Sequence, residues 1–312
     1  MKLALVFPGQ GSQSVGMMTG YDALPVVRET FAEASGALGQ DLWALVTEGP
    51  DDALNQTVNT QPVMLAADVA VYRAWQSTGG AQGALLAGHS LGEYAALVAS
   101  GALAFAEALP LVRFRAQAMQ DAVPAGVGAM AAVMGLDEPG IAEACREAAQ
   151  GQVVEPVNFN APGQVVIAGN REAVERAIAV AKTKGAKRAL LLPVSAPFHS
   201  QLMKPAAERL AAYLFQVRVD MPAMPVLHNV DVRAAAAPEG IRLALAQQAA
   251  SPVRWIETIQ AFAAQGVTHI VECGPGKVLT GLAKRIAPDI EALPLNDADA
   301  IATAAAATRE GA

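Results

Sequence analysis

Ser90 lies in a segment whose residue types and spacing are typical of nucleophilic catalysis. An apolar run, residues 84–88, leads into the motif Gly-His-Ser-Leu-Gly and then into a second apolar run. Gly-x-Ser-x-Gly between a strand and a helix is the pattern of a nucleophile elbow, a sharp turn that exposes the serine hydroxyl. Gly88 and Gly92 lack a Cβ, which lets the strand and the helix approach closely. The amide of Leu91 then lies at a helix N-terminus, where it can donate to an oxyanion.

A serine nucleophile needs a general base, and the chain offers four histidines. His89 adjoins Ser90, and neighbouring side chains at a strand end point to opposite faces, so we do not expect His89 to be the base. His228 and His269 lie in apolar strand contexts that are typical of hydrogen-bonded core residues. His199 follows a Ser-Ala-Pro-Phe break where the chain returns from a predicted insertion, and clefts form at such junctions. We therefore predict that His199 is the base.

The third member of a Ser-His-acid triad is missing from the pattern. No acidic residue between Ser90 and His199 stands in a turn typical of that member. In such a triad the acidic residue fixes the tautomer of the histidine. A backbone carbonyl could orient His199 instead.

Arg115 occupies an unexpected position on a predicted helix over residues 105–122. It shares an apolar face with Leu111, Ala118 and Met119, which are spaced by three and four residues. A buried guanidinium needs an anion. Two partners are possible: a carboxylate of the protein, or the free carboxylate of a ligand acyl group, bound through two parallel hydrogen bonds.

Composition narrows the class of protein. Of the 312 residues, 53% are hydrophobic and 16% are charged, which suffices for a large buried core. The net charge of −7 argues against nucleic acid as the main partner. Two distant cysteines without metal-ligand spacing are typical of a reducing compartment. The first apolar run, residues 3–7, is too short for a secretory signal, and no run approaches the ~18 residues of a membrane helix. We expect a cytoplasmic protein with no metal and no membrane contact.

The elements that must position these residues alternate between strands and helices, which predicts an α/β fold with a parallel sheet. We expect strands at 3–7, 84–88, 225–229 and 268–272, and helices at 25–38, 62–76, 91–100, 105–122, 200–214, 238–249, 253–265 and 277–285. The Ala-rich segment 298–308 is either a further helix or a frayed tail.

A second pattern interrupts this alternation. Its predicted elements follow the order β-α-β-β-α-β, which is typical of a ferredoxin-like unit. They are 128–136, 138–149, 153–159, 164–169, 171–184 and 187–194. The sequence therefore predicts a large domain over residues 1–125 and 198–312, and an inserted small subdomain over residues 126–197.

Two other motifs are ambiguous or unremarkable. The Gly-Pro-Gly-Lys segment at 274–277 lacks the spacing of a phosphate loop and is interpreted as a turn. A basic cluster in the insertion is either a solvated face or a dock for an acidic partner; its members are Lys182, Lys184, Lys187 and Arg188.

Several separate motifs occur together in one order. They are Phe7-Pro-Gly-Gln-Gly-Ser-Gln13, Gly88-His-Ser-Leu-Gly-Glu93, the Arg115 helix, Asn158-Phe-Asn-Ala-Pro-Gly-Gln164 and Pro197-Phe-His199. In these motifs the chain resembles the malonyl-CoA:acyl-carrier-protein transacylases of bacterial fatty-acid synthesis, over essentially its whole length. The resemblance implies an α/β-hydrolase-like large domain with a ferredoxin-like small subdomain. It also implies a ping-pong transfer of malonyl from coenzyme A to the pantetheine thiol of holo-acyl carrier protein.

The resemblance implies roles for the catalytic residues. Ser90 would carry the malonyl group, helped by His199, and the backbone carbonyl of Gln248 would orient His199. Malonyl-CoA would be a substrate, and no cofactor would be needed. We expect a monomer.

The resemblance also implies how the substrate is held. The amides of Gln10 and Leu91 would form the oxyanion hole. Arg115 would hold the malonyl carboxylate, Asn160 would line the cleft, and Phe198 is similar to its counterpart in malonyl-selecting members.

Two other functions fit the same motifs. One is the related transacylase subunit that loads the carrier of malonate decarboxylase. The other is a non-catalytic module that binds a carrier protein. A covalent malonyl adduct would exclude the module, and transfer to the fatty-acid carrier protein would exclude the decarboxylase subunit.

Overall fold

Strand β1 (Leu3–Phe7) is the centre of a parallel sheet with the strand order β7-β2-β1-β8-β9. All five residues of β1 are buried, because helices cover both faces of the sheet, and this explains its uninterrupted apolar sequence. This computed structural model describes residues 1–310. The other strands of the sheet are β2 (Leu85–Gly88), β7 (Val226–Leu227), β8 (His269–Glu272) and β9 (Glu291–Pro294).

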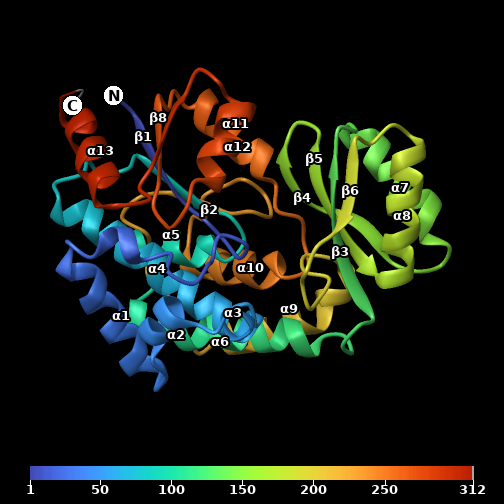
Figure 1. The fold of residues 1–312 in the computed structure, drawn as a ribbon, viewed down its shortest axis with the longest axis horizontal. Helices are drawn as coiled ribbons and strands as arrows, with labels where there is room; N and C mark the ends of the chain where they lie inside the picture. Colours follow the sequence, from blue (N-terminus) through green and yellow to red (C-terminus); the bar gives the residue numbers. More distant parts are fainter. Residues whose placement is uncertain (311–312) are drawn as a thin grey trace.

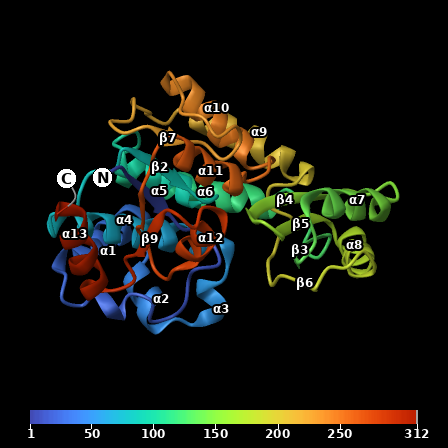
Figure 2. The same ribbon diagram turned by 90° about the horizontal axis from the view of Figure 1, so that it is seen from above.

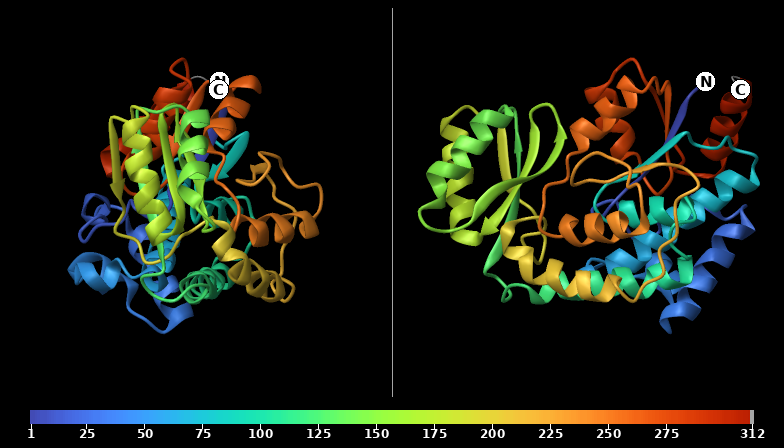
Figure 3. Two further views of the ribbon diagram at one scale, coloured as in Figure 1. Left: turned by 90° about the vertical axis from the view of Figure 1, so that its right-hand side faces the viewer. Right: turned by 180° about the vertical axis from the view of Figure 1, so that it is seen from behind.

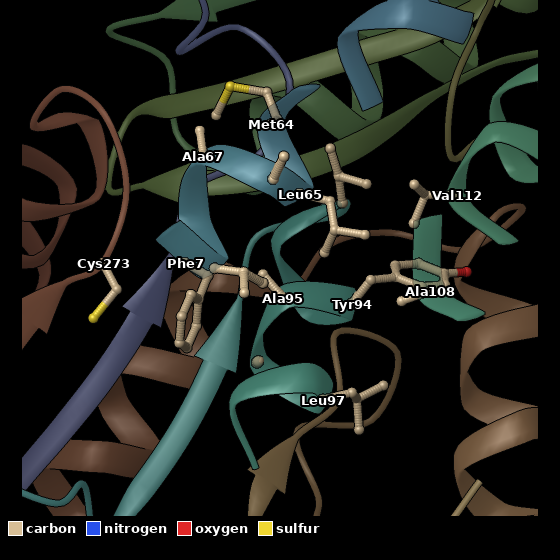
Figure 4. Packing of buried hydrophobic residues seen from close by; sticks show 14 of the residues in the cluster. Phe7, Met64, Leu65, Ala67, Tyr94, Ala95, Leu97, Ala108, Val112 and Cys273 are labelled. Carbon is tan, nitrogen blue, oxygen red and sulfur yellow. The ribbon is translucent and has the colours of Figure 1, made fainter. Parts of the chain in front are cut away.

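Alternate residues of β1 face two different apolar clusters. Leu5 and Phe7 point toward the side covered by α1, α4, α5 and α6, where Phe7 lies near Ala95 (Figure 4). Ala4 and Val6 point toward the side covered by α11 and α12. We refer to the parallel sheet and the helices packed on it as the large unit. Its helices are α1 (Pro25–Leu38), α2 (Leu42–Glu48), α3 (Asp51–Leu54), α4 (Thr57–Ser77), α5 (Gly92–Ala99), α6 (Phe105–Asp121), α9 (Lys204–Leu214), α10 (Pro238–Gln248), α11 (Trp255–Ala264), α12 (Val278–Ile286) and α13 (Ala298–Glu310), with 3-10 turns at Thr19–Tyr21 and Gln201–Met203.

A separate antiparallel sheet has the strand order β4-β5-β3-β6. Its elements follow the predicted order β-α-β-β-α-β: β3 (Gly128–Met134), α7 (Glu138–Ala149), β4 (Val154–Ala161), β5 (Gln164–Asn170), α8 (Arg171–Thr183) and β6 (Arg188–Leu191). Helices α7 and α8 pack on the face that is turned away from the large unit (Figure 1; Figure 3). We refer to this sheet with α7 and α8 as the small unit. It projects from the end of the large unit that is distant from α13 (Figure 2).

The structure differs from the predicted elements in several places. Helix α4 begins at Thr57, five residues before the predicted start, so that Pro62 lies inside it. Strand β4 continues through Ala161, so the turn to β5 is shorter than predicted and contains Gly163 at a φ of 68°. Strand β9 was not predicted, because four residues at a sheet edge carry too little pattern; pairing with β8 defines it. Helices α2 and α3 were not predicted either.

The Ala-rich segment after β9 forms helix α13 and is not a frayed tail. Ile301, Ala304 and Ala305 on one face of α13 are buried in the same apolar cluster as Leu5 and Phe7 of β1. None of the helices in residues 1–310 combines the length and the apolar character of a membrane span.

Candidate active site

Ser90 lies on a sharp turn between β2 and α5. Its φ is +53°, in the left-handed region that non-glycine residues rarely adopt. A Cβ on Gly88 would lie 1.8 Å from the carbonyl carbon of Gly92, and a Cβ on Gly92 would lie 2.0 Å from the carbonyl oxygen of Phe7. Both positions therefore require glycine. The close approach of strand and helix that the motif predicts is present.

His199 is the histidine that the fold brings to Ser90, across 109 residues of sequence. Its Nε2 lies 2.7 Å from Ser90 Oγ, and its Nδ1 lies 2.8 Å from the backbone oxygen of Gln248. A carbonyl can only accept, so Nδ1 carries the proton and Nε2 presents a lone pair to the serine hydroxyl. Burial, together with the charge of Arg115, lowers the pKa of His199 to about 3. The imidazole is therefore held in its neutral, basic form.

Arg115 is 2% exposed and points at the same hydroxyl. It donates to Ser90 Oγ at 3.1 Å, to the side-chain oxygen of Gln61 at 2.8 Å and to that of Gln248 at 2.8 Å. Its Nε has no partner, and Arg115 forms no ion pair within residues 1–310. A direct protein carboxylate partner, one of the two alternatives from the sequence, is thus absent from the described chain. The guanidinium retains donors for a ligand.

Two residues of the cavity that contains Ser90 have backbone amides without hydrogen-bond acceptors within residues 1–310. In the described part of the chain, neither the N–H of Gln10 nor that of Leu91 donates to a protein group. Both residues line the cavity that contains Ser90. The Gln10 side chain donates to Thr57 Oγ1 at 3.3 Å, which ties the loop after β1 to the start of α4. Leu91 precedes α5, so its amide lies at a helix N-terminus.

The cavity above Ser90 has a volume of about 400 Å³ and lies between the two units. Its polar lining includes Asn160, whose Oδ1 lies 2.8 Å from His89 Nε2, and Asn158, whose Oδ1 is buried without a partner. Its apolar lining comes largely from the small unit and from the segment that returns from it: Met130, Ala132, Met134, Val166, Leu192, Val194 and Phe198.

The structure brings together the site residues predicted from the sequence. Those residues are Gln10, Ser90, Leu91, Arg115, Asn160 and His199 along the cavity, with Gln248 behind it. Gln61 and Asn158 were not predicted. The sequence offers little signal for Gln61, because it follows two polar residues, Asn59 and Thr60, and lies just before the helix predicted at 62–76; α4 in fact begins at Thr57 and includes it.

The remaining histidines are bound elsewhere. His228 is 2% exposed, with Nδ1 2.8 Å from the carboxylate of Glu93, as expected of a hydrogen-bonded core residue. His269 is half-buried at the start of β8 and faces Glu291 at 3.2 Å, so it is less enclosed than expected.

Other motifs from the sequence have structural roles. The Gly-Pro-Gly-Lys segment forms a turn between β8 and α12. In the basic cluster, Lys184 pairs with Glu143 and Glu147, while Lys182, Lys187 and Arg188 are exposed. No cluster of side chains suited to a metal ion occurs in residues 1–310.

The comparisons with known proteins all find acyl transferases. A family model described as "Acyl transferase domain" matches residues 4–301. The "Malonyl CoA-acyl carrier protein transacylase" of Escherichia coli (strain K12) is 57% identical over 304 residues, which is 97% of this chain and 98% of the relative. The crystal structure of an acyl-carrier-protein S-malonyltransferase from Burkholderia pseudomallei superposes with a TM-score of 0.97 at 58% identity, covering 98% of this chain and 100% of that one. A type II PKS acyl-carrier protein in complex with its malonyl-transacylase gives a TM-score of 0.97 at 54% identity, covering 98% and 100%.

Proposed function

Because the chain belongs to the acyl transferase family and, within it, to the malonyl CoA-acyl carrier protein transacylases, we propose that it moves malonyl from coenzyme A to the pantetheine thiol of acyl carrier protein, supplying fatty-acid synthesis. One observation carries the proposal. Ser90 Oγ has a neutral histidine at 2.7 Å and a buried guanidinium at 3.1 Å. The nucleophilic oxygen of Ser90 is thus in contact with both its base, His199, and the guanidinium that would bind the malonyl carboxylate, Arg115.

In the first half-reaction, Ser90 Oγ attacks the thioester carbonyl carbon of malonyl-CoA. Its proton passes to His199 Nε2, and the carbonyl oxygen becomes an oxyanion. The free amides of Gln10 and Leu91 are the donors available to that oxyanion, and the helix N-terminus at Leu91 adds a favourable field. When the intermediate collapses, the carbon–sulfur bond breaks. Coenzyme A leaves as a thiol with the proton from His199, and a malonyl ester remains on Ser90.

The second half-reaction is the first in reverse with a different thiol. The pantetheine thiol of holo-acyl carrier protein gives its proton to His199 Nε2 and attacks the ester carbonyl. The oxyanion uses the same two amides, and Ser90 leaves with the proton. Atoms, protons and charge balance in both halves without a cofactor.

Arg115 supplies the preference for malonyl in this proposal. Malonyl differs from acetyl by one carboxylate, so discrimination needs a partner for that charge. A guanidinium that is 2% exposed and has spare donors offers a charge-assisted pair in a place with little water. Asn160, with its side-chain oxygen beside His89, would direct its NH₂ group toward the bound thioester.

The same proposal extends to the architecture. An α/β-hydrolase-like large domain over residues 1–125 and 198–312 would carry the chemistry, and a ferredoxin-like subdomain over residues 126–197 would form the opposite wall of the cleft. The parallel strand order, with Ser90 directly after β2, supports the first description. The β-α-β-β-α-β order supports the second.

Intact-mass analysis after mixing with malonyl-CoA tests the function. We expect one malonyl adduct in the wild type and none in Ser90→Ala. Adding holo-acyl carrier protein of fatty-acid synthesis should discharge the adduct. An adduct that survives in Ser90→Ala, or one that only the malonate decarboxylase carrier discharges, would contradict the proposal.

A further inference from the structure

Glu93 is a fully buried carboxylate directly behind the elbow. Its Oε1 lies 2.8 Å from His228 Nδ1, and its Oε2 accepts from the backbone N–H of Asn229 at 2.9 Å and from Gln248 Nε2 at 2.8 Å. Burial alone would lower the pKa of His228, but the hydrogen bond and the charge of Glu93 outweigh it and raise that pKa. A buried carboxylate is stable only with such donors.

The partners of Glu93 hold the backbone around Ser90. Asn229 accepts from the N–H of Ser90 at 2.8 Å and donates to the carbonyl oxygen of Gly88 at 2.7 Å. Gln248 Nε2 donates to the carbonyl oxygen of Ser90 at 2.9 Å. Because Ser90 has an unfavourable positive φ, its conformation persists only where surrounding contacts fix it. Both residues that supply these contacts are themselves bound to Glu93, Asn229 through its backbone N–H and Gln248 through its side-chain amide.

The same carboxylate decides which way the Gln248 amide faces. Its Nε2 points at Glu93, so its Oε1 points at Arg115 and accepts from it at 2.8 Å. The flipped amide would place an oxygen against the carboxylate and an NH₂ group against the guanidinium, and both contacts are repulsive. Without the charge of Glu93 this preference is weakened, because only the carbonyl oxygen of Ser90 and the guanidinium of Arg115 still favour it.

We propose that Glu93 is a positioning residue for the transacylation: through Gln248 it fixes the Arg115 guanidinium where the substrate carboxylate binds, and through Asn229 and Gln248 it holds the Ser90 backbone. The proposal rests on the function proposed above for Ser90 and Arg115. It also explains how Arg115 is tolerated without a direct anionic partner. The nearest carboxylate of the network lies one amide away.

The test compares malonyl-CoA with acetyl-CoA in wild type and in Glu93→Gln, a neutral variant of the same shape. Losing a hydrogen bond to a charged group typically costs about tenfold or more in an equilibrium. We expect the ratio of kcat/KM for malonyl-CoA to that for acetyl-CoA to fall about tenfold. A purely structural role would reduce the amount of folded enzyme and leave the ratio unchanged.

Glu272→Gln is the matched control. Glu272 is also fully buried and accepts three hydrogen bonds, from the N–H of Leu279 and from the N–H and Oγ1 of Thr280, but none of these groups contacts Ser90, Arg115 or Gln248. The Glu272→Gln variant should have a lower melting temperature but the wild-type ratio of kcat/KM for malonyl-CoA to that for acetyl-CoA.

Glu93→Asp keeps the charge on a shorter side chain and should shift the ratio in the same direction by less. If Glu93→Gln does not fold, Glu93→Asp is the variant whose ratio is measured. An unchanged ratio in the folded Glu93 variants, or an equal shift in Glu272→Gln, overturns the proposal. A wild type that forms no malonyl adduct would instead overturn the proposed function.

Discussion

The large and small units border the same cavity but contribute different chemistry to it. Most of the polar groups around Ser90 come from the large unit, where β1 and β2 end side by side and the N-terminus of α5 begins. Parallel strands gather loop amides and helix N-termini at one edge, and ligands bind there. The antiparallel small sheet buries one face under α7 and α8 and presents a mainly apolar face to the cavity. We infer that the large unit performs the reaction and the small unit shapes the space for the substrate.

Replacing the base should cause the largest effect, because it removes from the large unit the side chain that is placed to accept the proton of Ser90. Loss of a general base typically costs ~10²–10⁴-fold in rate. We expect His199→Ala to lose acylation rate by that factor while folding normally, measured as malonyl-serine formation by rapid quench and mass. His269→Ala is the control, since His269 lies at the opposite end of its strand from the cavity, and it should keep the wild-type rate. A loss in His269→Ala alone would mean that another histidine is the base.

Removing the guanidinium should cause the next largest effect, confined to one substrate. A charge-assisted pair is worth ~1.5–3 kcal/mol net, or on the order of 10–100-fold in selectivity. We expect Arg115→Ala to lose malonyl transfer by this factor and to keep or gain acetyl transfer. Arg115→Lys should restore little, because an ammonium lacks the planar fork. Equal losses in kcat/KM for the two substrates would show that Arg115 has only a structural role.

The pH dependence of acylation should reveal how strongly the large unit perturbs His199. An ordinary histidine, with a pKa of about 6.5, would lose roughly tenfold in base activity by pH 5.5. Only the neutral form of the imidazole can accept a proton. A pKa lowered to about 3 keeps His199 neutral at both pH 5.5 and pH 7.5. Acylation at pH 5.5 should therefore stay within about twofold of the rate at pH 7.5. The experiment is stopped-flow acylation with circular dichroism at each pH, and a midpoint near 6.5 would contradict the expected perturbation.

The smallest effect is expected from the apolar wall of the small unit. Met134, on β3, lines the cavity and is partly exposed. Truncating this side chain removes roughly a few tens of Å² of apolar contact with the substrate, which at ~25 cal/mol per Å² is well under the ~1.4 kcal/mol that corresponds to a tenfold change in affinity. Substrate binding should therefore weaken by about two- to threefold. Met134→Ala should raise KM by that factor and leave kcat within about twofold. A tenfold fall in kcat would show that the small unit takes part in the chemistry.

Local pattern was enough to predict much of this molecule. The buried strands appear as apolar runs, because parallel strands covered on both faces have no polar side, and the elbow at Ser90 appears in its two glycines. The element order of the small unit was predicted because each of its helices and strands has its own periodicity. Arg115 was recognised because its charge contradicts the apolar face of its own helix.

Only the tertiary structure decided which of these residues meet. The sequence left open whether a carboxylate neutralises Arg115, and it did not connect Glu93 with His228, Asn229 and Gln248. Gln248 contacts Ser90 across 158 residues of sequence, and no local pattern encodes such a distance. Strand β9 and the burial of α13 were also decided by their neighbours. The physical reason is common to all of them: a periodicity of two or 3.6 residues determines which face of an element is buried, whereas the partner of a polar side chain depends on how separate elements pack.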